Sequence, residues 1–202
     1  MNPADRNALE FALQIKEKAA QSNANAGKVE VITLMLGPSE SEGILKETLA
    51  LEADRAVVLS DPAFLGGDGT AAAIALGRAA SKLKADLILS GEGPIGHRVA
   101  EEMQIPSVYS VAGISFDPAG LKLLAGTDRG SVTVDGSLPL LASVVSGSNT
   151  PRIANAMKIM KAAKKEITRW TAGDLDLTPD KIGSAAAGVE RVRSFTPESN
   201  LL

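Results

Sequence analysis

The stretch Asp86–Pro106, DLILSGEGPIGHRVAEEMQIP, decides the fold class of this chain. Its first residues, DLILS, are mostly apolar and predict a buried parallel strand. The glycines Gly91, Gly93 and Gly96 then mark a turn, and helical spacing resumes from Gly96 to Met103. A strand, a glycine turn and a helix form the unit in which N–H groups at a helix start face an anionic group. Glycines there let a phosphate approach closely.

The glycine turn has three interpretations. Gly91–Gly96 fits the dinucleotide fingerprint G-x-G-x-x-G, but that motif belongs on the first strand of its fold, Glu92 adds negative charge and Pro94 removes a donor. A loop at the switch point of an α/β sheet, facing a nucleotide or another subunit, agrees better with its position. A plain turn without a ligand is the third interpretation.

The rest of the chain repeats this unit. Predicted helices cover 3–21, 39–51, 68–83 and 96–103, and predicted strands cover 28–36, 56–60, 86–90 and 107–111. Such alternation predicts a three-layer α/β fold, a mostly parallel, doubly wound, Rossmann-like sheet that binds adenine nucleotides. The pattern begins on a helix. We therefore expect either that another polypeptide supplies a first strand or that the sheet has an open edge to be covered.

The second half of the chain no longer alternates strands and helices. Short strands predicted over 121–124, 131–134 and 138–146 are joined by glycine turns and indicate a small antiparallel part. A helix is predicted over 151–165. Residues 1–172 are expected to form one α/β domain, and residues 173–202 an extended C-terminal arm lying on a partner subunit.

Composition excludes several classes of function. The 202 residues contain no cysteine and one histidine, so disulfides and thiolate catalysis are excluded and a histidine-based metal site or catalytic triad is disfavoured. A net charge of −3 and 3% aromatic residues argue against nucleic acid as a partner. No apolar run approaches the length of a membrane span. The start of the chain has no basic-then-apolar signal segment, which makes a cytoplasmic location the expectation.

Individual charged residues have simple structural interpretations. Asn2 and Asp68 are expected to cap the helices that follow them. On the first helix, Glu10 and Glu17 are expected on the solvent side, and Asp54 and Arg55 are expected to form a surface pair. The basic residues near the end of the last helix either steer an acidic partner or complement the helix dipole. They are Lys158, Lys161, Lys164 and Lys165.

Several short segments, taken in order, carry a family resemblance. They are Met1-Asn2-Pro3 with its helix, Leu36-Gly37-Pro38, ETLALEADR at 47–55, DLILSG at 86–91, AEEMQIP at 100–106, the strand 138–145, Asn149-Thr150-Pro151-Arg152, IMKA at 159–162, and Trp170 with 172–175. Together they resemble the β subunit of electron transfer flavoproteins over nearly the whole chain.

The resemblance implies a non-catalytic electron carrier. Such a subunit pairs with an α subunit, passes electrons from flavin dehydrogenases to an acceptor, shares FAD with the α subunit and buries AMP. By position, Asn2 and Leu36 would face the AMP, and the turn of Gly91, Gly93 and Gly96 would lie at its phosphates. The alternative is a nucleotide-binding regulatory or structural module of the same fold without electron transfer.

The resemblance also implies a segment that docks the partner dehydrogenase. Its residues would be Pro151, Arg152, Ala156, Met157, Lys161 and Lys164. The sequence departs from the family pattern in three places. The family's first strand, which touches AMP and reaches toward the flavin, is not present before Met1. The loop between Gly91 and Gly96 is shorter than the family's AMP loop, and the family's anchoring leucine falls on Ala156, beside Met157.

Overall fold

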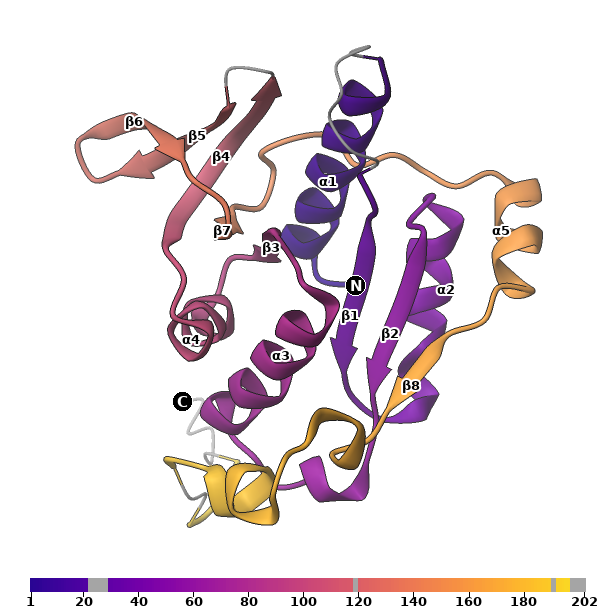
Figure 1. Cartoon of the computed structure of the whole chain (residues 1–202), viewed down its shortest axis with the longest axis vertical. Helices are drawn as coiled ribbons and strands as arrows, with labels where there is room; N and C mark the ends of the chain where they lie inside the picture. Colours follow the sequence, from indigo (N-terminus) through magenta and orange to yellow (C-terminus); the bar gives the residue numbers. More distant parts are fainter. Residues whose placement is uncertain (22–28, 118–119, 190–191, 197–202) are drawn as a thin grey trace, which may run out of the picture.

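The computed structural model describes residues 1–21, 29–117, 120–189 and 192–196. Its α-helices are α1 (Pro3–Gln21), α2 (Glu42–Ala50), α3 (Gly69–Leu83), α4 (Pro94–Met103) and α5 (Ala156–Ala163). Its strands are β1 (Ile32–Leu36), β2 (Arg55–Leu59), β3 (Leu87–Gly91), β4 (Ser107–Asp117), β5 (Gly120–Thr127), β6 (Gly130–Gly136), β7 (Leu140–Val144) and β8 (Thr168–Trp170). Figure 1 shows their arrangement.

The described strands form two sheets. One has three parallel strands in the order β1-β2-β8, and the other has five strands in the order β3-β7-β4-β5-β6. Strands β3, β7 and β4 are parallel, whereas β4, β5 and β6 are antiparallel. The predicted fold class, mostly parallel with a small antiparallel part, is confirmed. Strands β1 and β3 each end a sheet of the described residues, and both expected alternatives for the missing first strand stay open.

Alternate side chains of β2 point to opposite faces of the sheet and contact different helices. Ala56 and Val58 pack with α2, whereas Val57 and Leu59 pack with α3. Helix α1 packs with the end of α2 on the first side, and α4 packs with α3 on the second. The small residues of α3 are buried, which allows close approach to the sheet and to α4. These contacts make the three layers.

The expectation that 138–146 belongs to the antiparallel part is wrong. Strand β7 lies between β3 and β4 and is parallel to both. All of its residues are buried, as is typical of an interior strand covered on both faces. The glycine turns before β7 favoured an antiparallel prediction. Because both faces of β7 are apolar, the strand instead lies in the interior of the sheet, between β3 and β4.

The last predicted helix starts later than expected. Helix α5 begins at Ala156, where the Asn155 side chain accepts a hydrogen bond from the Lys158 N–H. The expected start, at Pro151, instead lies in a loop held against α1. The sequence analysis also missed β8, whose short run TRW shows little periodicity.

Part of the C-terminal region packs on the chain itself. Three short 3-10 turns lie between Gly173 and Ala186. Leu175, Leu177 and Ile182 are buried in one cluster with β2 and α3. Residues 190–191 and 197–202 lie outside the described residues, and contact of the arm with a partner stays a prediction. Among the described residues, no helix is both long and apolar enough to cross a membrane.

Candidate functional site

Gly91 ends β3 where the start of α1 crosses it. Its N–H donates to the Asp5 carboxylate, with 2.7 Å between nitrogen and Oδ1. A Cβ on Gly91 would lie 2.7 Å from the backbone nitrogen of Asp5, too close for any side chain. This glycine is therefore explained by contact between β3 and α1, because its N–H already has a protein acceptor.

Gly96 and Gly93 have different environments. A Cβ on Gly96 would lie 2.3 Å from the Ser90 hydroxyl, so this glycine lets α4 pack on β3. Gly93 is the N-cap of α4 with a φ of 148°, and nothing lies within 4 Å of where its Cβ would be. Because no side chain caps α4, the N–H groups of its first turn are available to an anion.

The charges around this turn are mixed. Glu92 accepts a hydrogen bond from the Ser146 N–H at 3.3 Å, which places a carboxylate near the start of α4. His97 stacks on Tyr109 with ring centroids 3.4 Å apart, and burial lowers the pKa of His97. A neutral imidazole offers no positive charge to a phosphate. The turn could therefore offer an anion only backbone N–H donors.

Of the other two nucleotide candidates, Asn2 lies near Gly91 and Leu36 does not. The Asn2 side chain accepts a hydrogen bond from the Ala4 N–H at 3.0 Å, which confirms the expected cap. Asn2 lies near Gly91, because the Gly91 N–H binds Asp5 in the first turn of the same helix. Leu36 instead lines a small cavity of about 40 Å³ with Phe64 and the start of α3. That start is capped by Asp68 as expected, through the N–H groups of Thr70 and Ala71.

A larger cavity of about 440 Å³ lies beside the start of α1. Its lining residues are Met1, Pro3, Arg6, Asn7, Ser146, Gly147, Asn149 and Pro151. The sequence analysis did not predict it, because the cavity joins segments about 140 residues apart, as in the Gly147 N–H to Asn7 Oδ1 contact. Arg6 on its wall pairs with Glu47 of α2 at 2.8 Å.

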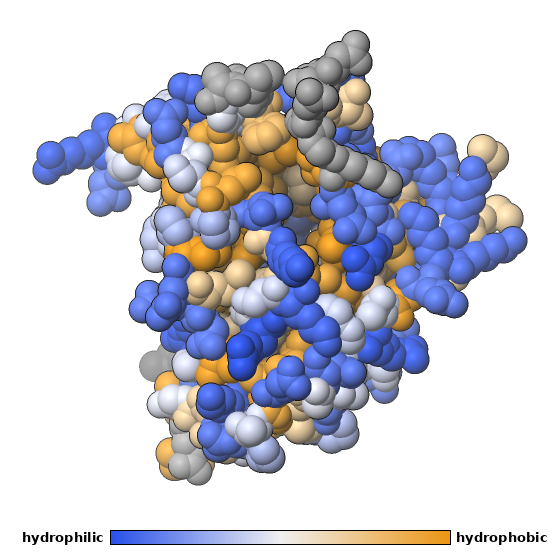
Figure 2. Space-filling model, viewed as in Figure 1, coloured by the Kyte–Doolittle hydropathy of each residue, from blue (hydrophilic) through white to orange (hydrophobic). Residues whose placement is uncertain are grey.

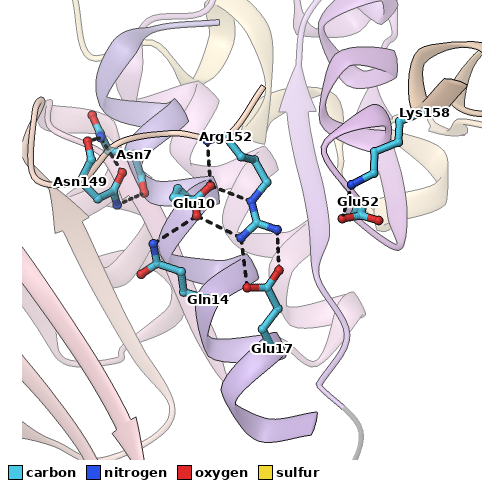
Figure 3. A network of polar contacts seen from close by, with 8 residues as sticks. All are labelled: Asn7, Glu10, Gln14, Glu17, Glu52, Asn149, Arg152 and Lys158. Carbon is cyan, nitrogen blue, oxygen red and sulfur yellow. Dashed lines mark hydrogen bonds and ion pairs between the residues drawn. The ribbon is translucent and has the colours of Figure 1, made fainter. Parts of the chain in front are cut away.

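Arg152 joins the segment before α5 to α1 (Figure 3). Its guanidinium binds both Glu10 oxygens at 2.9 and 3.0 Å, and its backbone N–H donates to Glu10 as well. It also reaches Glu17 at 2.5 Å. The expectation that Glu10 faces solvent is wrong: the residue is only 6% exposed. A carboxylate can be buried on this face because Arg152 pairs with it.

Two asparagines extend this network. The Asn7 amide donates to Asn149 at its backbone oxygen (2.8 Å) and its side-chain oxygen (2.7 Å). The Asn149 amide in turn donates to the Asn7 carbonyl at 3.0 Å. We call Asn7, Glu10, Glu17, Asn149 and Arg152 the α1 clamp, because these residues fix the loop before α5 on α1.

The electrostatics of the α1 clamp favour its ionised form. Burial raises the pKa of Glu10, but the hydrogen bonds from Arg152 outweigh burial, and the net effect lowers that pKa. Hydrogen bonds to Glu10 and Glu17 raise the pKa of Arg152. Arg152 is thus engaged inside the chain, and Pro151 beside it is half-buried.

Helix α5 presents an apolar face to solvent. Ala162 is buried against α2, whereas Met157 is 68% exposed and Met160 is 69% exposed. Ile153, in the loop before the helix, is 94% exposed. In Figure 2 the region of α5 is largely hydrophilic, with paler apolar atoms projecting at its rim. Ala156 and Met157 were predicted here from the sequence, whereas Ile153 and Met160 were not.

The lysines of α5 divide into two pairs. Lys158 forms an ion pair with Glu52 at 2.8 Å, and Lys165 donates to the Ala53 carbonyl at 3.2 Å. Within the described residues, Lys161 and Lys164 form no ion pair and are exposed. The expected Asp54–Arg55 pair is wrong, because Asp54 binds Lys16 and Arg55 faces Glu30.

These features define a three-layer, Rossmann-like α/β protein with an uncapped glycine turn before α4 and exposed apolar side chains on α5. Residues 1–175 match the electron transfer flavoprotein domain. The chain is 32% identical over 205 residues to the electron transfer flavoprotein subunit β of Clostridium acetobutylicum. It is 34% identical over 205 residues to subunit CarD of the caffeyl-CoA reductase-Etf complex of Acetobacterium woodii.

A third relative is the electron transfer flavoprotein subunit β of Mycobacterium tuberculosis, 30% identical over 206 residues. Each alignment covers 98% of this chain and 76% of the relative. The chain therefore belongs to the electron transfer flavoprotein family, and the resemblance seen in the sequence is confirmed.

Replacing Arg152 tests the α1 clamp. Arg152→Met leaves the Glu10 carboxylate buried without its partner, so we expect the free energy of unfolding at neutral pH to fall by about 3 kcal/mol. Glu17→Gln, the control, removes the half-exposed partner and is expected to cost less than about 1 kcal/mol. Urea denaturation measures both values, and equal losses would contradict the dominant role of Glu10.

The α1 clamp also predicts a pH dependence. Folding lowers the pKa of Glu10, so ionised Glu10 stabilises the fold. This stabilisation is complete above the pKa of Glu in the unfolded chain, about 4.3, and is lost as the pH falls through the lower pKa of the folded chain. The stability difference between the wild type and Glu10→Gln should therefore narrow below that window. Denaturation curves at a series of pH values measure the difference, and a gap independent of pH would contradict the assignment.

Proposed function

We propose that this chain is the electron-carrier subunit of a heterodimeric electron transfer flavoprotein. It pairs with an α subunit of the same family and carries electrons from flavin dehydrogenases to an acceptor, through FAD held with that subunit. The observation that carries the proposal is the exposed face of α5, where apolar Met157 and Met160 lie beside Lys161 and Lys164. A protein that exchanges partners needs such a contact surface outside its core.

FAD, when bound, supplies the redox chemistry, and the protein supplies position and electrostatics. The proposal gives this chain no catalytic residue of its own. In the part of the chain that the structure describes, no group of three or more His, Cys, Asp or Glu side chains could hold a metal ion. The role of the chain is then to position partners.

We propose that the turn before α4 binds the phosphate of AMP. The uncapped first turn of α4 and the open Cα of Gly93 suit a phosphate, and Asn2 lies near Gly91. Gly96 lets the turn pack closely, while the Gly91 N–H is already bound to Asp5. Leu36 lines a separate small cavity, so we assign it no phosphate contact.

Docking of a flavin dehydrogenase is proposed at α5. Met157 is the apolar anchor, since Ala156 at the neighbouring position is too small to fill a pocket. Lys161 and Lys164 steer an acidic partner, and the α1 clamp holds the segment Pro151–Arg152 from which α5 extends. Arg152 thus acts on docking through the position of α5.

Co-expression with an electron transfer flavoprotein α subunit tests the proposed function. We expect a yellow heterodimer, whose visible spectrum and nucleotide extraction reveal FAD and AMP. FAD without AMP would support the electron-carrier function and contradict the proposed phosphate site. A colourless chain that does not pair with the α subunit would contradict the electron-carrier function. It would favour the alternative function, a regulatory or structural nucleotide-binding module.

Substitutions on α5 test docking. Met157→Ala and Lys164→Glu should each lower the second-order rate of FAD reduction by a donor flavin dehydrogenase about tenfold, because one removes an apolar anchor and the other reverses a steering charge. Stopped-flow absorbance measures the rate. Arg78→Glu, on the exposed side of α3, is the control and should leave the rate unchanged. Loss of FAD from the variants, or an equal effect of Arg78→Glu, would contradict docking at α5.

A further inference from the structure

Glu52 lies at a position that its residue type disfavours. It comes shortly after the end of α2 at Ala50, and its φ is 83°. The Glu52 N–H donates to the Leu49 carbonyl at 3.3 Å, and the Ala53 N–H donates to the Thr48 carbonyl at 3.1 Å. These two bonds form a Schellman motif, whose positive-φ residue is usually glycine because a Cβ is strained there.

The charge of Glu52 is also unfavourable at this end of α2. Carbonyl groups at a helix C-terminus carry partial negative charge and therefore repel a carboxylate. Helices α3 and α4 end in a similar way, but their positive-φ residues are Lys84 at 54° and Gln104 at 53°. Neither is acidic, and both lie in the usual left-handed range of about 50° to 70°, which the 83° of Glu52 exceeds. Local structure thus disfavours Glu52 in backbone conformation and in charge.

The polar groups of Glu52 contact two other helices. Its carboxylate pairs with Lys158 of α5 at 2.8 Å, as Figure 3 shows. Its backbone carbonyl accepts a hydrogen bond from Lys16 of α1 at 3.3 Å. The hydrogen bond from Lys158 outweighs burial and lowers the pKa of Glu52. The charges of Arg152 and Lys16 lower this pKa further, so Glu52 is an ionised link between α2 and α5.

The two ends of α5 are attached to α2 in different ways. At the end of α5, Ala162 is buried against α2, and Lys46 of α2 donates to the Ala163 carbonyl at 3.1 Å. At its start, the residues from 156 to 160 are all exposed except Lys158, which is half-buried. Among the residues that the structure describes, the pair with Glu52 is the one ion pair that α5 forms. Glu52 therefore supplies the polar attachment of the start of α5.

A gain in stability does not explain Glu52. The Lys158 side chain is 41% exposed and that of Glu52 is 52% exposed, and ion pairs between such exposed side chains contribute little to the free energy of unfolding. A positive φ at a residue with a Cβ costs more than such a pair contributes. An acid at this position is therefore explained better by where it holds Lys158 than by net stability.

We propose that Glu52 is a positioning residue for the docking surface on α5. Met157 directly precedes Lys158, so fixing Lys158 also fixes the helical turn that carries this apolar anchor. The same pair neutralises Lys158 and leaves Lys161 and Lys164 as the cations that face an acidic partner. This inference rests on the proposed function, in which a flavin dehydrogenase docks at α5.

Glu52→Gly, in the heterodimer with the α subunit, tests the inference. Glycine suits a φ of 83°, so this variant relaxes the backbone and releases Lys158 at the same time. The matched control is Lys84→Gly, which relaxes the corresponding exposed position after α3 and leaves α5 unchanged. A double variant, Glu52→Lys with Lys158→Glu, restores the ion pair with its charges exchanged.

The rate of FAD reduction is measured by stopped flow over a range of concentrations of a purified donor flavin dehydrogenase. For Glu52→Gly, the concentration at half-maximal rate should rise about fivefold with an unchanged limiting rate, because docking weakens and electron transfer after docking does not change. The midpoint of urea denaturation should not fall. Lys84→Gly should match the wild type, and the double variant should return to within about twofold of it.

Amide hydrogen exchange on the chain without FAD gives a second readout. In the first turn of α5, the Ile159 N–H donates to the Asn155 carbonyl at 3.1 Å. Glu52→Gly should speed exchange at Ile159 and Met160 about fivefold, because this turn loses its attachment to α2. Exchange at Lys165, beyond the other end of α5, should change little.

The outcomes separate this inference from the proposed function. If Met157→Ala raises the half-maximal concentration and Glu52→Gly does not, the role of Glu52 is overturned and docking at α5 is supported. A lower limiting rate together with a lower urea midpoint would show a purely structural role and would also overturn the inference, as would a double variant that behaves like Glu52→Gly. Failure of the dehydrogenase to reduce FAD in the wild-type heterodimer would contradict the proposed function itself.

Discussion

The ion pair between Glu10 and Arg152 fixes how the two sheets of this chain are connected. After β7 the chain leaves the five-stranded sheet and reaches β8 in the three-stranded sheet by way of α5. The loop at the start of this crossing is held on α1 by Arg152 and by the paired amides of Asn7 and Asn149. A buried carboxylate tolerates its position only with a well-placed cation, so Glu10 and Arg152 depend on each other.

Helix α1, which holds Glu10, packs beside both sheets. One part of α1 packs on Leu89 and Val144 of the five-stranded sheet, and another packs with Val31 and the end of α2 beside the three-stranded sheet. The α1 clamp therefore connects three things: the two sheets, the loop before α5 and the exposed face of α5. In the proposed carrier, this connection keeps the docking helix in a constant position relative to the FAD held with the partner subunit.

Local patterns predicted most elements, and contacts between distant residues decided the rest. The caps at Asn2 and Asp68, the helix bounds of α1 and α3 and the strand–helix alternation follow from short-range spacing, and the structure confirms them. Burial of Glu10 could not be predicted, because its partner Arg152 lies 142 residues away. The parallel pairing of β7 was missed for a similar reason, since its neighbours β3 and β4 are distant in sequence. The candidate site was predicted in part: Met157, Lys161 and Lys164 are exposed on α5, whereas Met160 and Ile153 were not named, because exposure of an apolar side chain depends on packing that the sequence does not show.

We propose that this chain works in electron transfer through a flavin. The most direct measurement is anaerobic reduction of FAD in the purified complex of this chain with its α subunit, followed by absorbance after addition of a reduced flavin dehydrogenase. We expect the flavin to be reduced and then reoxidised by an added acceptor, and the α subunit without this chain not to support the same turnover. A flavin that stays oxidised in the intact complex, or equal turnover without this chain, would contradict the account.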